Sequence, residues 1–557
     1  MIPQHRDIGR NVPMAHLQPR FSSQGGTLPH HIRLTSMRGF MPDTVWLTGE
    51  EVRGIWATRF RERGPDHPFW LYTHIPFCPQ ICSFCQCSTS LRKSDRQVAV
   101  YLEWLEGEID FLAETSQSGL VKFQYVGGGT PNILSESQLE WLLGKLNRQF
   151  RFDPTSRRTF EFLPSGLRPE TLPLVRSLGF NRLSCGVQSW SGETLKAVNR
   201  SQAGLDELGR TIQDAHDLGY DEINIDLIHG IGDETNERFL EGLLQVLALR
   251  PTTVTIHHVI PTPTNPVFSS VEEELTAHSV FETLEQRLGD AVARRFPDMQ
   301  WVLRPNSWIV VDRDFWKGPE FSYWYFSDNE RIHIDMLSFG RFAHSNIPGH
   351  ICYENLSQAA QYDPKQNSYH AFRKTPAIDA ALDLITDLVG DRRSDLTPIR
   401  QRYGADGLRP LQPALERLRS DGCVVQRDGL WEPVQTDGVF IDPFWPLLEA
   451  AMQDMSGPWT LPLGKQVENA IRIGEGERSL LVFIEKISPD KRYFCEMGRL
   501  GIYYRHPNHT QRAGQESWVD ELMRAFLDEV AQLLEQVPNI SPKAAMARLR
   551  RERSAQQ

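Results

Sequence analysis

The chain has 557 residues, and 60 Lys and Arg against 71 Asp and Glu give it a formal net charge of −11. Apolar residues make up 40% and charged residues 24%, which indicates a globular protein and excludes disordered, collagen-like and coiled-coil classes. This length predicts three or four domains and excludes a single small binding module.

The N-terminal residues predict an extended arm over 1–45, because this stretch is rich in Pro, Gly, Ser and His. Arg6, Arg10 and Arg20 interrupt it and no continuous apolar run occurs, so we expect neither a signal peptide nor a membrane span. The acidic balance argues against nucleic-acid and membrane partners. Four of the eight cysteines crowd into 78–87, which favours a cytoplasmic protein with one metal site over a disulfide framework.

The core, expected over 46–372, alternates short β-type runs with amphipathic helical patterns. The helical stripe of Val98, Leu102, Leu105, Ile109 and Leu112 is one example. Six such βα units predict an α/β fold with a parallel sheet, either open and doubly wound or a partial barrel. The expected strands are 70–75, 122–126, 159–162, 182–187, 222–228 and 253–259.

Two further domains are expected after the core. Helical runs at 378–388 and 411–418, followed by strands at 424–426 and 430–433, predict a winged-helix-like domain over 373–457. Beyond it, β-rich stretches at 480–485 and 493–504 and a helix near 518–534 predict an extra α+β domain over 458–557, whose role the sequence does not indicate.

Three thiols, Cys78, Cys82 and Cys85, follow the first expected strand at C-x3-C-x2-C spacing. One compact loop can direct all three at a single centre. Zinc normally takes four ligands, often as two pairs, and no second pair is present. Three thiolates on a 4Fe–4S cluster would leave one iron open to a small molecule, whereas Cys87 as a fourth ligand would make an electron-transfer site.

A run of three glycines, Gly127, Gly128 and Gly129, follows the second expected strand and precedes Thr130 and Pro131. Without Cβ atoms, such a run lets a ligand approach the backbone closely, although it also suits a tight turn.

These two motifs, in this order, resemble the radical S-adenosylmethionine superfamily, and within it the oxygen-independent coproporphyrinogen III oxidase family over residues 70–440. Further stretches at 161–164, 179–189, 198–200, 223–228 and 337–340 carry the likeness. The resemblance implies a partial (β/α)6 barrel, followed by a winged-helix-like domain. It also implies a 4Fe–4S cluster on Cys78, Cys82 and Cys85, reduced by a protein such as flavodoxin or ferredoxin.

The resemblance further implies two molecules of S-adenosylmethionine at the carboxyl ends of the strands. The first would be held by Tyr72, Gly128 and Glu161, with Glu161 on the ribose hydroxyls. Among the positions for the second, Gln188 and Asp226 are the candidate catalytic residues. The positions matching the second molecule are Phe84, Gly129, Thr130, Gln188, Arg200 and Asp226.

Three hypotheses for the function stay open at this point. The first is oxidative decarboxylation of the tetrapyrrole coproporphyrinogen III, favoured by the C-x-C ending at Cys87. The second is radical methylation or cyclopropanation of an sp2 carbon in an aromatic or other natural product, favoured by His229, which replaces an expected aromatic residue. The third is a haem-binding chaperone or a winged-helix regulator.

Several aromatic and histidine side chains are candidates for lining a pocket for a flat substrate. His257 and His258, at the end of the sixth strand, are candidate proton carriers or haem ligands. The pocket candidates are Tyr323, Trp324, Tyr325, Phe326, His333, Phe342 and His344.

Overall fold

The structure is a computed structural model. It describes residues 44–258, 286–315, 334–434 and 445–452, with gaps at 86–88, 202–203, 232–233, 305–306, 358–362 and 389–392, and parts of 471–551. The chain divides into two compact units, 31–462 and the combination of 1–30 with 463–557. Most of the predicted N-terminal arm, residues 1–43, lies outside the described residues.

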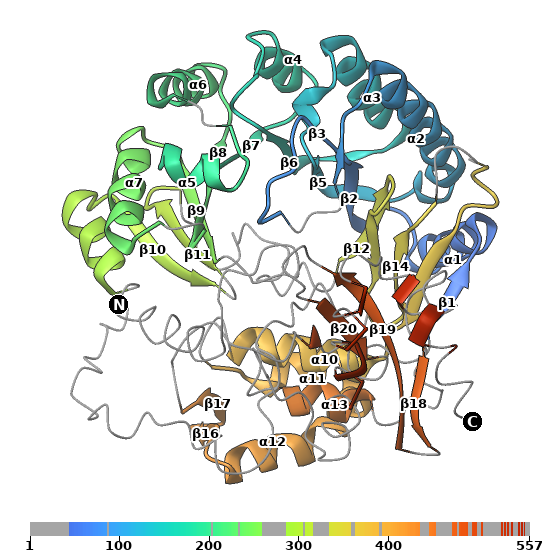
Figure 1. The fold of residues 1–557 in the computed structure, drawn as a ribbon. Helices are drawn as coiled ribbons and strands as arrows, with labels where there is room; N and C mark the ends of the chain where they lie inside the picture. Colours follow the sequence, from blue (N-terminus) through green and yellow to red (C-terminus); the bar gives the residue numbers. More distant parts are fainter. Residues whose placement is uncertain are drawn as a thin grey trace. The chain divides into compact units, whose positions relative to one another are not determined.

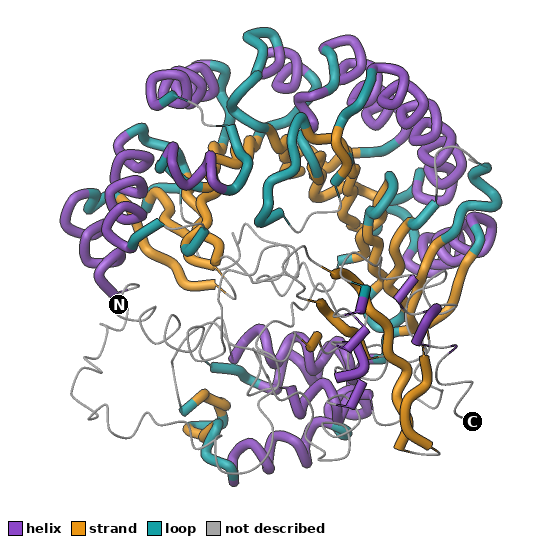
Figure 2. The backbone as a smooth tube through the Cα atoms, in the orientation of Figure 1, coloured by secondary structure: helices purple, strands orange, loops and turns teal. Residues whose placement is uncertain are grey.

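A mixed sheet of thirteen strands organises unit 31–462 within the residues described. All six predicted strands are present, lie in chain order and pair in parallel. They curve into an open barrel with helices along its outer face (Figures 1 and 2). The strands are β2 (Pro68–Ile75), β5 (Leu120–Gly128), β6 (Phe152–Phe162), β7 (Arg182–Gln188), β8 (Glu222–His229) and β9 (Thr253–His258).

The six predicted strands form the expected parallel core, and the sheet continues beyond both of its edges, so that the whole sheet is mixed. β12 (Asp335–Phe339) adds to β2 in parallel, and the remaining additions all pair antiparallel. Beyond β12 lie β13 (His344–Ile347), β14 (Ile351–Asn355), β15 (Tyr369–Arg373) and β1 (Thr44–Leu47), and beyond β9 lie β11 (Ser307–Asp312) and β10 (Met299–Arg304).

The outer helices form where a capping residue is followed in the sequence by an apolar stripe at helical spacing. In α2 (Asp95–Ser116), the Ser94 side chain accepts a hydrogen bond from the Gln97 backbone N–H, and the predicted stripe is buried. The other helices of this layer are α1 (Gly49–Arg63), α3 (Glu136–Gln149), α4 (Thr171–Ser177), α5 (Gly192–Ala197), α6 (Leu205–Asp217) and α7 (Asn236–Ala248).

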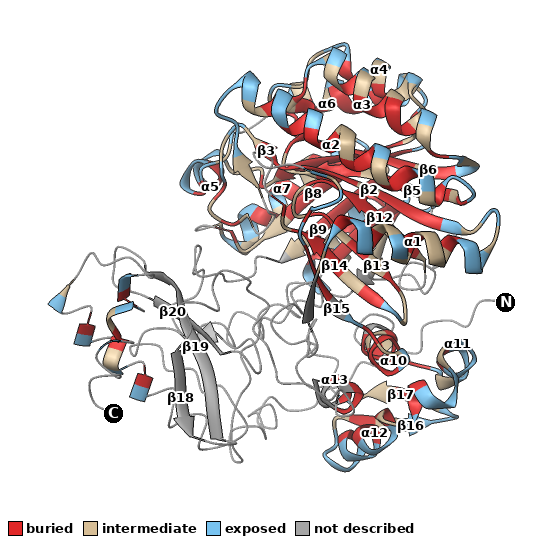
Figure 3. Cartoon of the chain, turned by 90° about the vertical axis from the view of Figure 1, so that its right-hand side faces the viewer, coloured by how far each residue is buried: buried red, intermediate tan, exposed pale blue. Residues whose placement is uncertain are grey.

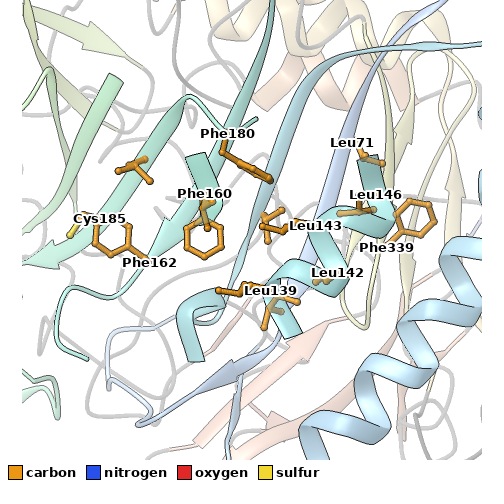
Figure 4. Close-up of a cluster of buried hydrophobic side chains, with 14 of the residues drawn as sticks. Leu71, Leu139, Leu142, Leu143, Leu146, Phe160, Phe162, Phe180, Cys185 and Phe339 are labelled. Carbon is orange, nitrogen blue, oxygen red and sulfur yellow. The ribbon is translucent and has the colours of Figure 1, made fainter. Parts of the chain in front are cut away.

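The hydrophobic core lies between these helices and the sheet, where Figure 3 shows the buried residues concentrated. Figure 4 shows the leucines of α3 gathered with Phe160 and Phe162 of β6 and with Phe180. Since the apolar side chains face the helices, the polar side chains of the same strands face the inside of the barrel.

The segment after the sheet contains both predicted helices and the predicted hairpin, together with two helices that the periodicity did not predict. Gly404, at φ 72°, interrupts one of these two helices, α11, and this explains why its apolar residues do not follow a clear helical periodicity. The elements are α10 (Pro376–Thr386), α11 (Leu396–Leu408), α12 (Leu411–Ser420), β16 (Val424–Arg427), β17 (Leu430–Pro433) and α13 (Trp445–Met452).

The second unit contains an antiparallel sheet of four strands among its described residues. The described residues between 525 and 536 are helical, within or just after the region where a helix is predicted. The strands are β18 (Ile471–Glu475), β19 (Arg478–Ile487), β20 (Tyr493–Met497) and β21 (Tyr503–Tyr504).

Candidate active site

The cysteine loop follows β2 directly and brings three thiols near one another. Cys78 lies in β3 (Phe77–Cys78), and the Cys85 backbone N–H donates to the Cys82 carbonyl over 3.1 Å. Burial, opposed by the hydrogen bond with Thr130 and helped by the nearby Cys85 and Cys82, raises the pKa of Cys78 to about 11. Ligation of a metal therefore has to displace protons from these thiols.

Within the part of the chain that the structure describes, no group of three or more His, Cys, Asp or Glu side chains is close enough to hold a single metal ion. The three thiolates of a 4Fe–4S cluster bind three different irons, so the loop need not meet the geometry of a single ion. Cys87 lies outside the described residues, and its role stays a prediction.

The glycine run at the end of β5 lies against the cysteine loop. Gly129 N–H donates to the Ile75 carbonyl over 2.7 Å, and Thr130 N–H donates to the Phe77 carbonyl over 2.8 Å. A Cβ on Gly129 would stand 2.5 Å from the Phe77 carbonyl oxygen, so this position accepts only glycine. The Thr130 hydroxyl lies 3.3 Å from the Cys78 sulfur. The two motifs are thus one structural unit.

Glu161, in β6, lies beside this run, and its carboxylate accepts a hydrogen bond from the Gly128 backbone N–H over 3.1 Å. Burial, with a smaller contribution from the charge of Asp226, raises the pKa of Glu161 to about 8. A ligand that brings hydroxyl donors or positive charge would favour the ionised form.

Tyr72 and His74 alternate along β2 and therefore point to the same side of the strand. The Tyr72 hydroxyl lies 2.8 Å from His74 Nδ1, and a Cβ on Gly128 would stand 2.5 Å from the His74 ring. His74 is not among the residues predicted from the sequence, although its two-residue spacing from Tyr72 places both side chains on the same face of a strand.

Gln188 and Arg200 each carry a buried polar atom with no hydrogen-bond partner among the described residues, Gln188 Oε1 and Arg200 Nε. Buried polar atoms in folded proteins rarely stay unpaired, so both atoms are available to hydrogen-bond a bound molecule. Arg200 Nη1 also lies 3.5 Å from the Cys82 sulfur, and the guanidinium lies 6.0 Å from the centre of the Phe84 ring. Arg200 therefore links the cysteine loop to the end of β7.

Asp226, in β8, belongs to a hydrogen-bonded network inside the barrel. Its two carboxylate oxygens accept from Ser184 Oγ and Asn224 Nδ2, each over 2.9 Å. His257 Nε2 lies 3.8 Å from Asp226 Oδ1. Asp226 is thus fixed by its neighbours, with His257 beside it.

The remaining candidate residues from the sequence either make other contacts or lie outside the described residues. His229 packs at 5.1 Å against the Phe239 ring and lies 2.9 Å from the Asn236 side chain, and burial lowers its pKa, so it acts as a neutral packing residue. His344 lies 3.7 Å from Glu354, and Arg341 stacks on Phe342. Residues outside the described set are Tyr323, Trp324, Tyr325, Phe326 and His333, and nothing is described of the His258 side chain.

A sequence model of the Radical SAM superfamily matches residues 72–243. The oxygen-independent coproporphyrinogen III oxidase of Escherichia coli is 34% identical over 384 residues, which cover 65% of this chain and 81% of that protein. This chain belongs to the radical SAM superfamily, in the family of the oxygen-independent coproporphyrinogen III oxidases.

The family also has a matching solved fold. Coproporphyrinogen III oxidase (HemN) from Escherichia coli superposes with a TM-score of 0.58 at 21% identity, covering 76% of this chain and 99% of that one. Heme chaperone HemW of the same organism is 32% identical over 258 residues, or 46% of this chain and 68% of that protein. The chain spans only 44% of the length of the Salmonella oxidases that it matches.

The described helices also show whether the chain has features needed to bind nucleic acid or to cross a membrane. On α12, the helix before the hairpin of β16 and β17, Arg417 pairs with Asp421 at 3.7 Å and Arg419 with Glu416 at 2.5 Å, so acidic neighbours balance the positive charges that a nucleic-acid-binding helix would need. Among the helices described, none combines the length and apolar character needed to cross a membrane. The cytoplasmic location stays a prediction.

Proposed function

We propose that this radical SAM protein catalyses the oxidative decarboxylation of coproporphyrinogen III or a closely related tetrapyrrole. The main support is the 34% identity to the Escherichia coli oxidase over 81% of that protein's length. The thiols of the cysteine loop, the glycine run and the buried unpaired atoms of Gln188 and Arg200 fit the cofactors of that reaction.

The cluster would be held by Cys78, Cys82 and Cys85. When bound, it and S-adenosylmethionine would supply the abstraction of a hydrogen atom from a propionate side chain, whose loss of carbon dioxide and one electron gives the vinyl group. The Cys82 thiolate would be stabilised by Arg200, since the charge of Arg200 partly offsets the raised pKa that burial gives Cys82.

The first S-adenosylmethionine would be oriented by Tyr72, the Gly128 backbone and Glu161. The Tyr72 hydroxyl is held by His74, and the Glu161 carboxylate by Gly128 N–H, so both groups are positioned before the ligand arrives. A carboxylate in this buried place accepts hydrogen bonds from ribose hydroxyls more strongly than it would in water.

A second S-adenosylmethionine would be held by Gln188 and Arg200, with Phe84, Gly129, Thr130 and Asp226 around it. Arg200 Nε can donate to a ligand carboxylate, and Gln188 Oε1 can accept from an amine. Asp226, already anchored by Ser184 and Asn224, offers a fixed negative charge to a ligand cation. We assign Gln188 and Asp226 to contact with the reacting groups.

A haem-binding chaperone is the second candidate function. It is favoured by the 32% identity to heme chaperone HemW over 68% of that protein. Radical methylation has no support from the relatives named above, and it enters only as an outcome of the experiment.

The test is an anaerobic assay of the reconstituted protein with dithionite and S-adenosylmethionine, with and without coproporphyrinogen III. We expect 5′-deoxyadenosine together with carbon dioxide and vinyl products. 5′-Deoxyadenosine with S-adenosylhomocysteine would instead indicate methyl-group chemistry, and haem binding without cleavage would indicate the chaperone.

Two cysteine variants serve as controls for the cluster. Cys82→Ala should abolish cluster binding and activity, because it removes a ligand. Cys423→Ala should leave the iron content unchanged, because this residue lies beside the hairpin of β16 and β17. We also expect Cys87→Ala to retain the cluster, and loss of iron in that variant would contradict the three-ligand assignment.

A further inference from the structure

The turn after β12, residues 340–343, lies at the edge of the sheet where the cysteine loop begins. β12 runs parallel to β2, with Phe339 opposite Thr73, so both strands end at the same edge. A Cβ on Gly340 would stand 2.7 Å from the His74 carbonyl oxygen, which places the turn directly beside the last residues of β2. The turn is therefore at the carboxyl ends of the strands, as the candidate site is.

The backbone of this turn is fixed by contacts with two neighbouring elements, β14 and α2. Phe342 has φ 68°, a conformation that is rare for a large side chain and that persists only where surrounding contacts enforce it. Phe342 N–H donates to the Asn355 carbonyl over 2.7 Å, and Asn355 N–H donates to the Ala343 carbonyl over 3.0 Å. The buried Glu108 carboxylate accepts from Gly340 N–H over 2.8 Å and from Asn355 Nδ2 over 2.5 Å. Backbone strain of this kind clusters at ligand sites, and here it fixes the residue between Gly340 and Phe342.

Arg341, which is that residue, carries a positive charge that no described side chain balances. Its Nε is buried and has no hydrogen-bond partner among the described residues. Its guanidinium stacks over the Phe342 ring, 4.5 Å from the ring centre, and forms no ion pair within the part of the chain that the structure describes. Two carboxylates on the elements that hold the turn have other partners, since Glu108 accepts from three neutral donors and Glu354 lies 3.7 Å from His344. A donor and a positive charge are thus left for an anion that is not part of the described chain.

The chemistry of Arg341 favours a carboxylate as that anion. A guanidinium presents a planar fork of N–H donors that matches the two oxygens of a carboxylate, and stacking on an aromatic ring holds the fork in place. Among the other ionisable side chains of the candidate site, Glu161 and Asp226 offer no positive charge, and Arg200 Nη1 lies 3.5 Å from the Cys82 sulfur. An anionic part of a substrate therefore needs a cation elsewhere at this edge of the sheet, and Arg341 supplies one.

We propose that Arg341 binds a propionate carboxylate of the tetrapyrrole substrate; this inference rests on the proposed function and names a residue that recognises its substrate. Coproporphyrinogen III carries a propionate on each pyrrole ring, and only a reacting propionate loses its carboxylate. A propionate that stays intact can therefore remain paired with Arg341 throughout the reaction. The fixed turn holds the macrocycle by this carboxylate while another propionate reaches the reacting centre.

The test is equilibrium dialysis of the full-length reconstituted protein against coproporphyrin III, an oxidised form of the substrate that keeps every propionate and does not react. We expect Arg341→Gln, which removes the charge, to raise the dissociation constant by about tenfold or more. Arg341→Lys keeps the charge but not the fork, and should raise it by less. The matched control is Arg53→Gln, because Arg53 also stacks on a phenylalanine ring, that of Phe111 at 4.9 Å, but pairs with Glu114 of α2. The control should bind the porphyrin as tightly as the parent does.

S-Adenosylmethionine also carries a carboxylate, so its dissociation constant is measured in the same proteins. We expect this constant to be unchanged in all of them. An equal or larger loss of affinity for S-adenosylmethionine would overturn the proposal, because it would assign Arg341 to the cofactor. A lower melting temperature of Arg341→Gln with both dissociation constants unchanged would also overturn it, because Arg341 would then be structural only.

The outcomes separate this proposal from the proposed function. Equal porphyrin affinities of the parent and Arg341→Gln would overturn the role of Arg341 alone. Equal losses in Arg341→Gln and Arg341→Lys would overturn it as well, because the charge would then not be what binds the carboxylate. A parent that binds the porphyrin but forms no vinyl product in the anaerobic assay would count against the proposed function only, and no porphyrin binding by the parent would contradict both.

Discussion

At the residue scale, Glu161 illustrates how the barrel prepares a ligand contact. Its side chain is buried, and within the described residues its carboxylate accepts a hydrogen bond from Gly128 N–H. Burial and the negative charge of nearby Asp226 favour the protonated acid. A bound cationic ligand with hydroxyl groups would reverse that preference, which couples binding to release of a proton.

This arrangement makes the stability of the cluster-free protein depend on pH. The pKa of Glu161 rises from its ordinary value of 4.5 to about 8 in the folded state. Because the folded state holds this proton more tightly than the unfolded state, the free energy of unfolding should fall as the pH rises from 4.5 to about 8. The full effect is on the order of 5 kcal/mol.

Glu161→Gln removes this ionisation while keeping the side-chain volume. Its melting temperature should therefore exceed that of the parent at pH values above 8, and the difference should shrink toward pH 5. Calorimetry of the cluster-free proteins at three pH values measures this. Melting curves that differ by a constant amount at every pH would show that Glu161 is ionised in the folded state throughout.

At the element scale, the pairing of β12 with β2 helps to hold the strand that carries Tyr72. Gly340 follows β12 at φ 104°, and its N–H donates to the buried Glu108 carboxylate over 2.8 Å. Tyr101, from α2, donates its hydroxyl hydrogen to the His74 carbonyl over 2.6 Å. Since His74 also contacts the Tyr72 hydroxyl, the packing of β12 and α2 fixes the strand that carries Tyr72.

Gly340→Ala should disrupt the packing of the residue after β12 against β2 and α2. A Cβ there would stand 2.5 Å from the Tyr101 hydroxyl and 2.7 Å from the His74 carbonyl oxygen, in a backbone conformation that also disfavours alanine. We expect a loss of about 2–4 kcal/mol in stability and weaker binding of S-adenosylmethionine. Thermal unfolding and calorimetric titration measure these two effects.

Gly349→Ala is the matched control, because Gly349 has φ 70° but nothing within 4 Å of the added Cβ. It should cost about 1 kcal/mol from backbone conformation alone and leave ligand binding unchanged. Equal losses in the two variants would mean that the contacts of Gly340 with His74 and Tyr101 do not matter.

At the scale of the whole molecule, the candidate site belongs to one of the two compact units. Every described candidate residue, from Tyr72 to His344, lies in unit 31–462, as does the hydrophobic core between the sheet and its helices. The strands β18 to β21 form their own antiparallel sheet in the other unit. The division suggests that residues 463–557 contribute something other than the radical chemistry.

A chain truncated after Pro462 should therefore fold, bind the cluster and cleave S-adenosylmethionine with dithionite at a rate close to that of the full chain. Iron content, the melting temperature and the rate of 5′-deoxyadenosine formation measure this. A stable, iron-loaded but inactive truncated protein would assign the C-terminal residues a part in the reaction.

The sequence by itself determined the six parallel strands, the α2 stripe, the cysteine loop and its place after β2, because periodicity and motif spacing are local properties of the chain. It also indicated Glu161 and Arg200 through their motifs. The contact of His74 with Tyr72, the unpaired atoms of Gln188 and Arg200, the packing role of His229 and the antiparallel extension of the sheet were decided only by the tertiary structure. Each of these depends on contacts between segments, or on the direction in which a side chain points, and linear spacing encodes neither.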